Sequence, residues 1–219
     1  MSKLQNTFAK LLFSLPDSFL IRLSGLPQMK AKGGRAMDPA NQLLLTTLLK
    51  KRILGIDESK TVPQLRDWWK SQLAPFENPP LKGVSHRDIK VHVEGDSIRI
   101  REYTPSGLGT NVPALVYLHG GGFTAFEIET YQSFCEFVSK KLNIKIYSVG
   151  YRLAPEHPFP VPLEDCCAAF SWVLDNAEEL GIDANRISVG GDSAGGNLSA
   201  ALCLKRRDLG QKMPKGQLL

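Results

Sequence analysis

The sequence predicts an α/β protein whose mostly parallel sheet is covered by helices on both faces. From about residue 80 onward, segments with strand character alternate with segments of helical periodicity, as parallel sheets require. Residues 113–118 form an unbroken apolar run, typical of a strand buried on both faces. Before residue 80 the chain is poor in strands. We therefore expect a helical region at 1–79 and an α/β core at 80–219.

The first region is expected to be helical because apolar residues recur at helical spacing. Three helices are expected there, at 3–15, 39–54 and 63–73. The second has clear start and stop signals, since Asp38 and Pro39 suit its N-terminus and Gly55 suits its end. Prolines within 74–83 then predict a linker.

The core is expected to begin with a hairpin. Residues 84–94 and 97–104 read as two strands joined at Gly95 and Asp96. Apolar runs and helical periodicity then alternate, with strands expected at 113–118, 143–149 and 187–189 and helices at 129–142, 163–180 and 197–209. Residues 215–219 are expected to open a further strand.

The composition is that of a globular protein and excludes several other classes. Hydrophobic residues make up 42% and charged residues 22% of the 219-residue chain, which argues against disorder. The net charge is +5, but basic residues cluster only briefly, as at 50–52 and 205–207, so we expect no nucleic-acid partner. No apolar run approaches the roughly 20 residues of a membrane span.

The N-terminus and the cysteines favour a cytoplasmic protein. Charged residues and a proline interrupt the apolar residues of 1–30, so we expect a retained helical segment rather than a signal peptide. The cysteines do not follow a metal-binding spacing. They predict buried, reduced thiols and no metal site: Cys135, Cys166, Cys167 and Cys203.

The strongest functional signal is the pattern G-x-S-x-G, formed by Gly191, Asp192, Ser193, Ala194 and Gly195 between an expected strand and an expected helix. The glycines permit a sharp turn, which would present the Ser193 hydroxyl at the carboxyl end of the sheet. The N-terminus of the following helix favours negative charge there. A glycine-rich turn with an incidental serine, or a phosphate-binding loop, is the alternative. The lysine of a Walker loop is absent, so we interpret Ser193 as a nucleophile.

A second signal is the run His119, Gly120, Gly121, Gly122 and Phe123, which directly follows the apolar run 113–118. Consecutive glycines let backbone N–H groups approach a substrate closely, as in the oxyanion-hole loops of lipases and esterases. A flexible loop would also explain three glycines alone, but their pairing with the serine turn favours the oxyanion loop. We interpret His119 as a structural support of this loop rather than as a base.

The third signal is the proline-rich segment 151–160, which reads YRLAPEHPFP. Glu156 and His157 could be interpreted as an acid and a base. We favour a rigid, internally hydrogen-bonded connection, because four prolines between 155 and 162 restrict the backbone.

Together, HGGGF, YRLAPEHPFP and GDSAGGN resemble the hormone-sensitive-lipase branch of the α/β-hydrolase fold family, which are carboxylic ester hydrolases. The resemblance implies that the helices of 1–79 form part of a cap over an acyl pocket. It implies that Ser193 is the nucleophile and that the backbone N–H groups of Gly121, Gly122 and Ala194 form the oxyanion hole. The implied substrates are small acyl esters, and the family needs no metal or organic cofactor.

The resemblance covers the N-terminal two-thirds of such an enzyme. In this fold the triad runs in the order Ser, Asp or Glu, then His. The only acidic residue after Ser193 is Asp208, about 22 Å away along the expected helix. All four histidines precede Ser193: His86, His92, His119 and His157. We therefore expect a fold truncated before its last strands, with no triad acid or base and with weak or absent ester turnover.

An incomplete sheet has a further expected consequence, because an exposed sheet edge favours self-association. Two alternatives to an ester hydrolase stay open. One is a small-molecule-binding relative without catalysis, and the other is a truncated remnant without function. Retention of both Ser193 and the three glycines favours the enzyme.

Overall fold

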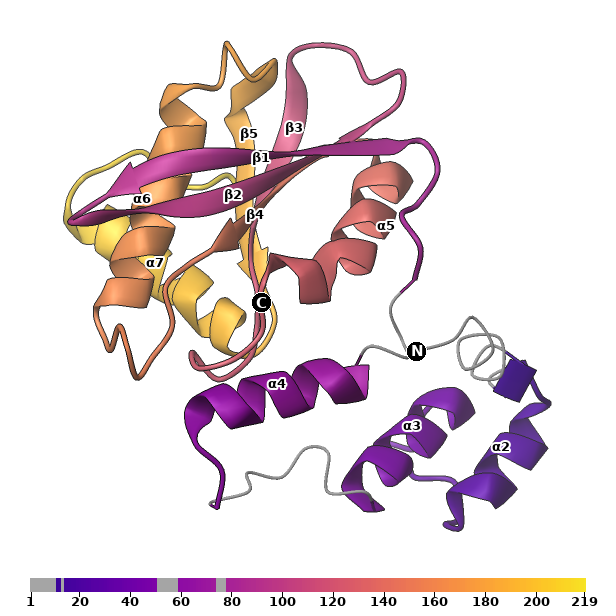
Figure 1. The fold of residues 1–219 in the computed structure, drawn as a ribbon. Coiled ribbons are helices and arrows are strands. Elements are labelled where there is room, and N and C mark those ends of the chain that lie inside the picture. Colours follow the sequence, from indigo (N-terminus) through magenta and orange to yellow (C-terminus); the bar gives the residue numbers. More distant parts are fainter. Residues whose placement is uncertain (1–10, 13, 51–58, 74–77) are drawn as a thin grey trace. The chain divides into compact units, whose positions relative to one another are not determined.

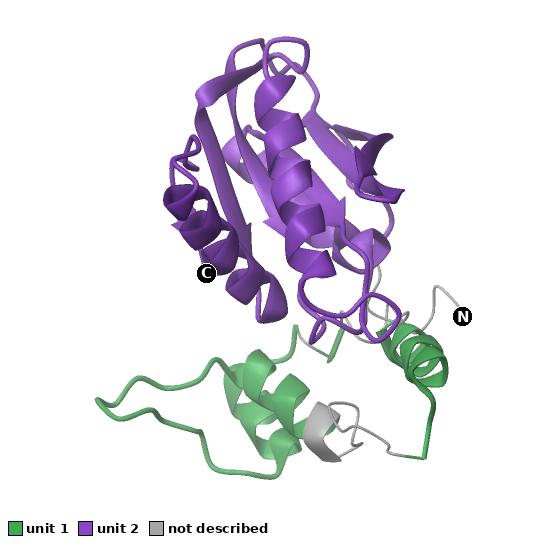
Figure 2. Ribbon diagram, turned by 90° about the vertical axis from the view of Figure 1, so that its left-hand side faces the viewer, with its two compact units in different colours: residues 1–78 green, residues 79–219 purple. Residues whose placement is uncertain are grey.

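The computed structural model describes residues 11–12, 14–50, 59–73 and 78–219 of the chain. The chain divides into two compact units, Met1–Asn78 and Pro79–Leu219 (Figure 2). This boundary adjoins the one expected between residues 79 and 80. The function of the first unit as a cap stays a prediction.

The first unit is helical where the structure describes it. Its helices are α2 (Asp17–Ser24), α3 (Pro39–Lys50) and α4 (Val62–Leu73). Helix α3 begins at Pro39, as expected, with the Asp38 carboxylate accepting a hydrogen bond from the N–H of Asn41 at 3.0 Å. The expected end of this helix, and most of the helix expected at 3–15, lie outside the described residues.

The second unit is built on a six-stranded sheet (Figure 1). Its strands are β1 (Val84–Val93), β2 (Asp96–Pro105), β3 (Val112–Leu118), β4 (Lys145–Gly150), β5 (Ile182–Gly191) and β6 (Gln217–Leu218). The strand order is β1-β2-β4-β3-β5-β6. Pairings from β4 to β6 are parallel, while the β1–β2 hairpin and its junction with β4 are antiparallel. The sheet is therefore mixed but mostly parallel, as the sequence predicts.

Helices cover both faces of this sheet, and β3 shows why its sequence is apolar throughout. Leu115 and Tyr117 share a core cluster with Cys135 of α5 (Gln132–Leu142). Val116 and Leu118 belong to the larger cluster, which includes residues of α6 (Val161–Asp175) and α7 (Ala194–Asp208). Alternate side chains of one strand thus enter two cores, which confirms the prediction of a strand buried on both faces.

Several element boundaries differ from the expected ones. The helix expected to reach residue 180 ends at Asp175, where the Asn176 side chain donates to the carbonyl of Trp172 at 2.7 Å. Strand β5 begins at Ile182, before an irregularity: Ile182 pairs with Val112, whereas Ile187 pairs with Ala114. Between these two pairs β5 advances by five residues while β3 advances by two, and this mismatch disrupts the alternation of side chains that marks a strand. The 3₁₀ turn η2 (Ile128–Tyr131) replaces the first turn expected before α5.

A further difference concerns the segment that bears Ser193. Helix α7 begins at Ala194 rather than at residue 197, because the N–H of Asn197 already donates to the carbonyl of Ser193 at 3.0 Å. The strand expected at 215–219 forms as the two-residue β6, parallel to β5. It is the outer strand of the sheet, and association of copies through this edge stays a prediction.

Two further expectations concern the burial of the cysteines and the lack of a membrane span. Cys135, Cys166 and Cys203 are buried, Cys167 is half-buried, and all four are free thiols. Within the described ranges, the helices are too short and too polar to span a bilayer.

Candidate active site

Ser193 lies in the sharp turn between β5 and α7. Its backbone has φ 51° and ψ −116°, a conformation that residues with a side chain rarely adopt. Such strain costs on the order of 1–3 kcal/mol and persists only where the surroundings enforce it. The Ser193 side chain is exposed. This strained, exposed serine at the N-terminus of a long helix has the backbone geometry that the predicted nucleophile elbow requires, and its role stays a prediction.

The two glycines of this turn have no room for a side chain. A Cβ atom on Gly195 would lie 1.9 Å from the carbonyl oxygen of Leu118, and one on Gly191 would lie 2.1 Å from the same atom. Leu118 is the last residue of β3 and pairs with Gly191 in the sheet. The absent side chains therefore let the serine turn press directly against the start of the loop that follows β3.

That loop, residues 119–123, takes its shape from its own glycines. Gly121 has φ +117° and Gly122 has φ +62°. The carbonyl of Gly121 accepts a hydrogen bond from the N–H of Ala125 at 3.0 Å. A Cβ on Gly121 would lie 2.1 Å from the carbonyl oxygen of Ala125, whereas one on Gly122 would meet no atom nearer than 4.0 Å. The loop is thus a tight turn whose outer corner, Gly122, is open.

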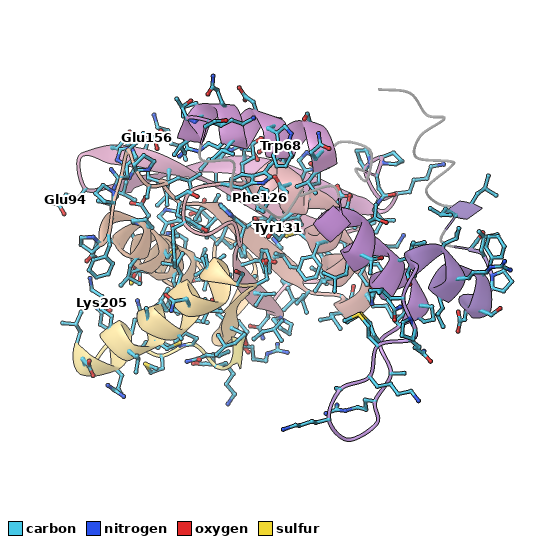
Figure 3. The ribbon with its side chains drawn as sticks, turned by 90° about the horizontal axis from the view of Figure 1, so that it is seen from below. Trp68, Glu94, Phe126, Tyr131, Glu156 and Lys205 are labelled. Atoms are coloured by element: carbon cyan, nitrogen blue, oxygen red, sulfur yellow. The ribbon has the colours of Figure 1, made fainter. Side chains whose placement is uncertain are left out.

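Asp192 links the two segments. One oxygen of its carboxylate accepts hydrogen bonds from the Tyr117 hydroxyl at 2.7 Å and from the backbone N–H of Gly120 at 3.0 Å. The other oxygen accepts from the hydroxyl of Tyr131, labelled in Figure 3, at 2.8 Å. Burial, and then the hydrogen bond to Asp192, raise the pKa of both tyrosines, so both stay protonated donors at neutral pH.

Three backbone N–H groups of the two linked segments have no backbone acceptor in the part of the chain that the structure describes. Among the described residues, no backbone hydrogen bond is donated by the N–H groups of Gly121, Gly122 or Ala194. Ala194 begins α7, where the first N–H groups of a helix lack intrahelical acceptors. Free N–H groups beside an exposed hydroxyl can bind an oxygen on which negative charge develops.

His119 is enclosed and does not present an imidazole to solvent. It is 1% exposed, and its ring stacks on Tyr151 with ring centroids 4.2 Å apart. Its Nδ1 lies 2.7 Å from the carbonyl oxygen of Gly120, and the Tyr151 hydroxyl donates to the His119 carbonyl at 2.6 Å. Burial lowers the pKa of His119. A neutral ring held in this way suits the shaping of the glycine loop, the role that the sequence analysis favours.

The segment 151–160 is tied both to that loop and to α6. The N–H of Ala154 donates to the carbonyl of Phe123 at 2.9 Å, and the N–H of His157 donates to the carbonyl of Leu153 at 2.9 Å. Arg152 forms an ion pair with the fully buried carboxylate of Asp165, its terminal nitrogen 2.7 Å from an oxygen. These bonds fit the rigid connection that the sequence analysis favours.

Sequence reasoning did not find several residues of this arrangement. Tyr117 and Tyr131 lie 75 and 61 positions from Asp192, and no local pattern marks them. The sequence shows Tyr151 only as the first residue of the segment 151–160 and gives no sign of its contact with His119. In the described part of the chain, no group of three or more His, Cys, Asp or Glu side chains could hold a metal ion.

The chain is similar in sequence to known α/β hydrolases. Residues 115–219 match a family described as alpha/beta hydrolase fold. The carboxylic ester hydrolase LipN of Mycobacterium tuberculosis is 38% identical over 179 residues, which is 80% of this chain and 46% of LipN. The hormone-sensitive lipase of Mus musculus is 38% identical over 102 residues, 47% of this chain and 13% of the lipase.

The fold is also similar to that of a solved ester hydrolase. An ester hydrolase from the metagenome of Lake Arreo superimposes with a TM-score of 0.73 at 37% identity, over 80% of this chain and 56% of that protein. The chain spans about half the length of LipN and of this ester hydrolase.

Proposed function

The chain belongs to the α/β-hydrolase fold family, among carboxylesterases and lipases similar to hormone-sensitive lipase, and from this we propose that it serves the hydrolysis of carboxylic esters through a serine acyl-enzyme. The substrates we propose are small acyl esters. The observation that carries the proposal is the bridge of Asp192, which joins the turn bearing Ser193 to the loop bearing the free N–H groups.

In the proposed reaction, the Ser193 oxygen attacks the carbonyl carbon of the ester. The carbonyl oxygen gains negative charge, and the N–H groups of Gly121, Gly122 and Ala194 donate hydrogen bonds to it. The bond to the alcohol oxygen then breaks, and the alcohol leaves with a proton while the acyl group stays on Ser193. Water attacks this ester in the second half-reaction and releases the carboxylic acid.

The first step needs a base to accept the Ser193 proton, and we propose no residue among these 219 for that task. A serine hydroxyl without a base is a weak nucleophile at neutral pH. Oxyanion donors and binding alone can still leave roughly 10³–10⁴-fold catalysis over water. We therefore propose that a polypeptide of these 219 residues is acylated slowly and turns over weakly.

The test is to incubate the 219-residue chain with p-nitrophenyl butyrate and locate the acyl group by peptide mass spectrometry. We expect slow addition of a single butyryl group on Ser193 and none on Ser193→Ala. Ser85→Ala is the matched control, because Ser85 is an exposed serine on β1 and its removal should leave acylation unchanged.

Two results would contradict the proposal. Butyryl groups spread over several serines or lysines, at rates equal in Ser193→Ala, would show that residue 193 is not activated. Binding of the ester without any acylation after prolonged incubation would favour a non-catalytic binding protein.

A further inference from the structure

The net charge of the chain is confined to its first 50 residues. Residues 1–50 hold seven Lys and Arg against two Asp and Glu, whereas residues 51–219 hold 20 of each. The overall charge of +5 therefore belongs to this N-terminal segment, and the α/β unit contributes none of it. A separate basic segment on an otherwise neutral chain indicates a partner with negative charge.

Three of these seven cations lie on a short hairpin between α2 and α3. Lys30 bridges to Ala36, and the N–H of Met37 donates to the carbonyl of Met29 at 2.8 Å. Gly33 and Gly34, both with positive φ, form its tip. Figure 3 shows the hairpin as a violet loop whose nitrogen-tipped side chains point away from the helices of this unit.

Three cations on the hairpin are available to a partner. Lys30, Lys32 and Arg35 are exposed, and no ion pair joins them to another residue that the structure describes. Many other cations of the chain are paired, as Arg101 is with Asp88 and Glu129. The hairpin thus retains its full charge.

A buried side chain holds the base of the hairpin in place. Gln42 of α3 is fully buried, and its amide nitrogen donates to the hydroxyl of Ser24 at 2.9 Å and to the carbonyl of Pro27 at 3.1 Å. Its amide oxygen accepts from the N–H of Met29 at 2.8 Å. The end of α2, the start of the hairpin and α3 are therefore one fixed structure.

Apolar side chains lie exposed along the same segment. They are Phe19, Leu23, Leu26 and Met29, which are 40–49% exposed. Phe19 and Leu23 are four residues apart on α2, while Leu20 and Ser24 on the same helix are buried. Phe19 and Leu23 thus lie on one side of α2, and Leu26 and Met29 follow them along the chain into the base of the basic hairpin.

We propose that this surface, formed by α2 and residues 26–37, binds the surface of a membrane containing anionic phospholipid. Lysine and arginine side chains are attracted to the lipid phosphates and carboxylates, and the apolar side chains enter the boundary between headgroups and acyl chains. An acidic protein or polyanion would account for the cations but would leave Phe19 and Leu23 in water. The lipid surface accounts for both.

The test uses the full 219-residue chain carrying Ser193→Ala, so that the result does not depend on ester hydrolysis. Sedimentation is measured with vesicles of 30% phosphatidylserine in phosphatidylcholine and with vesicles of phosphatidylcholine alone. We expect at least tenfold stronger binding to the anionic vesicles, weakening as salt rises. Because each cation near such a surface contributes about fivefold, Lys30→Gln, Lys32→Gln and Arg35→Gln together should weaken binding about a hundredfold.

A matched variant separates position from net charge. Lys90→Gln, Lys141→Gln and Lys215→Gln remove the same charge from exposed sites in the α/β unit and should leave binding within about threefold of the parent. Phe19→Gln with Leu23→Gln keeps every charge and should weaken binding at least tenfold, with circular dichroism confirming that the helices persist.

Three outcomes would overturn the proposal. One is equal binding to both kinds of vesicle, or no binding to either. Another is equal loss in the hairpin and control variants. The last is a chain that binds polyglutamate as tightly as anionic vesicles and is unaffected by the change at Phe19 and Leu23, which would indicate an acidic protein partner.

Discussion

The two segments that meet at Ser193 are held in place by different means. The serine turn, residues 191–195, depends on absent atoms, because a Cβ on Gly191 or Gly195 would overlap the Leu118 carbonyl oxygen. The glycine loop, residues 119–123, also lacks room for a Cβ at Gly121, but it depends in addition on groups that are present: the Asp192 carboxylate, two tyrosine hydroxyls and the Tyr151 ring. A close steric fit tolerates no added side chain, whereas a segment held by several hydrogen bonds loses stability in proportion to the number of bonds removed. The following changes test this difference.

The largest effect is expected from Gly195→Ala. The new methyl would lie 1.9 Å from the Leu118 carbonyl oxygen, a contact that only a movement of β3 or α7 could relieve. We expect a loss of more than about 4 kcal/mol in the free energy of unfolding, measured by urea denaturation. The matched change is Gly122→Ala, which meets no atom nearer than 4.0 Å and should cost about 1 kcal/mol for its positive φ. Similar losses in both would show that steric fit does not distinguish the two segments.

A smaller effect is expected from Asp192→Asn. The side chain keeps its shape but loses the charge that accepts three hydrogen bonds, so we expect a loss of about 2 kcal/mol by urea denaturation. Acylation of Ser193 should slow as well, because Gly120 is no longer fixed beside the serine turn. Asp208→Asn, an exposed carboxylate at the end of α7, is the control and should change stability by less than about 0.5 kcal/mol. An unchanged stability of Asp192→Asn would remove the carboxylate as the anchor.

Ser193→Gly is expected to stabilise the chain. Glycine adopts φ 51° and ψ −116° readily, so its gain from relieved strain should exceed its entropy cost by about 1 kcal/mol. Ser193→Ala keeps the strain and should leave the melting temperature nearly unchanged. A melting temperature of Ser193→Gly at or below that of Ser193→Ala would show that the turn is unstrained.

The smallest effect is expected in the dependence of stability on acid pH. The turn η2 carries Tyr131, and Glu129 of that turn pairs with Arg99 and Arg101, which also bind Asp88. The hydrogen bond from Arg101 lowers the pKa of Asp88 to about 2. Burial, the largest single influence on Glu129, raises its pKa, but the hydrogen bond from Arg99, a backbone hydrogen bond and the charges of Arg99 and Arg101 together outweigh burial, so the pKa of Glu129 is lowered.

Both carboxylates therefore contribute stability that is complete above their unfolded pKa values, near 4, and is lost as pH falls toward 2. The pairs are partly exposed, so we expect less than about 1 kcal/mol over this window. Thermal unfolding between pH 5 and pH 2 measures it, and Asp88→Asn should flatten part of the dependence. A stability that falls equally steeply in Asp88→Asn would assign the acid sensitivity to other groups.

The sequence alone determined those features that depend on neighbours in the chain. An apolar run of six residues is sufficient to place β3 between two cores, and glycines around a serine are sufficient to mark a strand–helix turn. The alternation of strands and helices likewise determined the class of the fold. It did not determine the length of β5, because the irregularity before Ile187 breaks the alternation on which such a prediction depends.

Only the tertiary structure decided which side chains support the candidate site. In the sequence Asp192 is only one residue of the G-x-S-x-G pattern, yet its carboxylate accepts hydrogen bonds from Tyr131 and Tyr117, which lie 61 and 75 positions away. Arg152 and Asp165 form a buried ion pair although each has an ordinary local explanation. The first unit shows the same limit, because Gln42 joins α2 and α3 through a buried amide that no periodicity reveals. Periodicity records which face of an element is apolar, whereas a hydrogen bond between distant residues exists only once packing has brought donor and acceptor together.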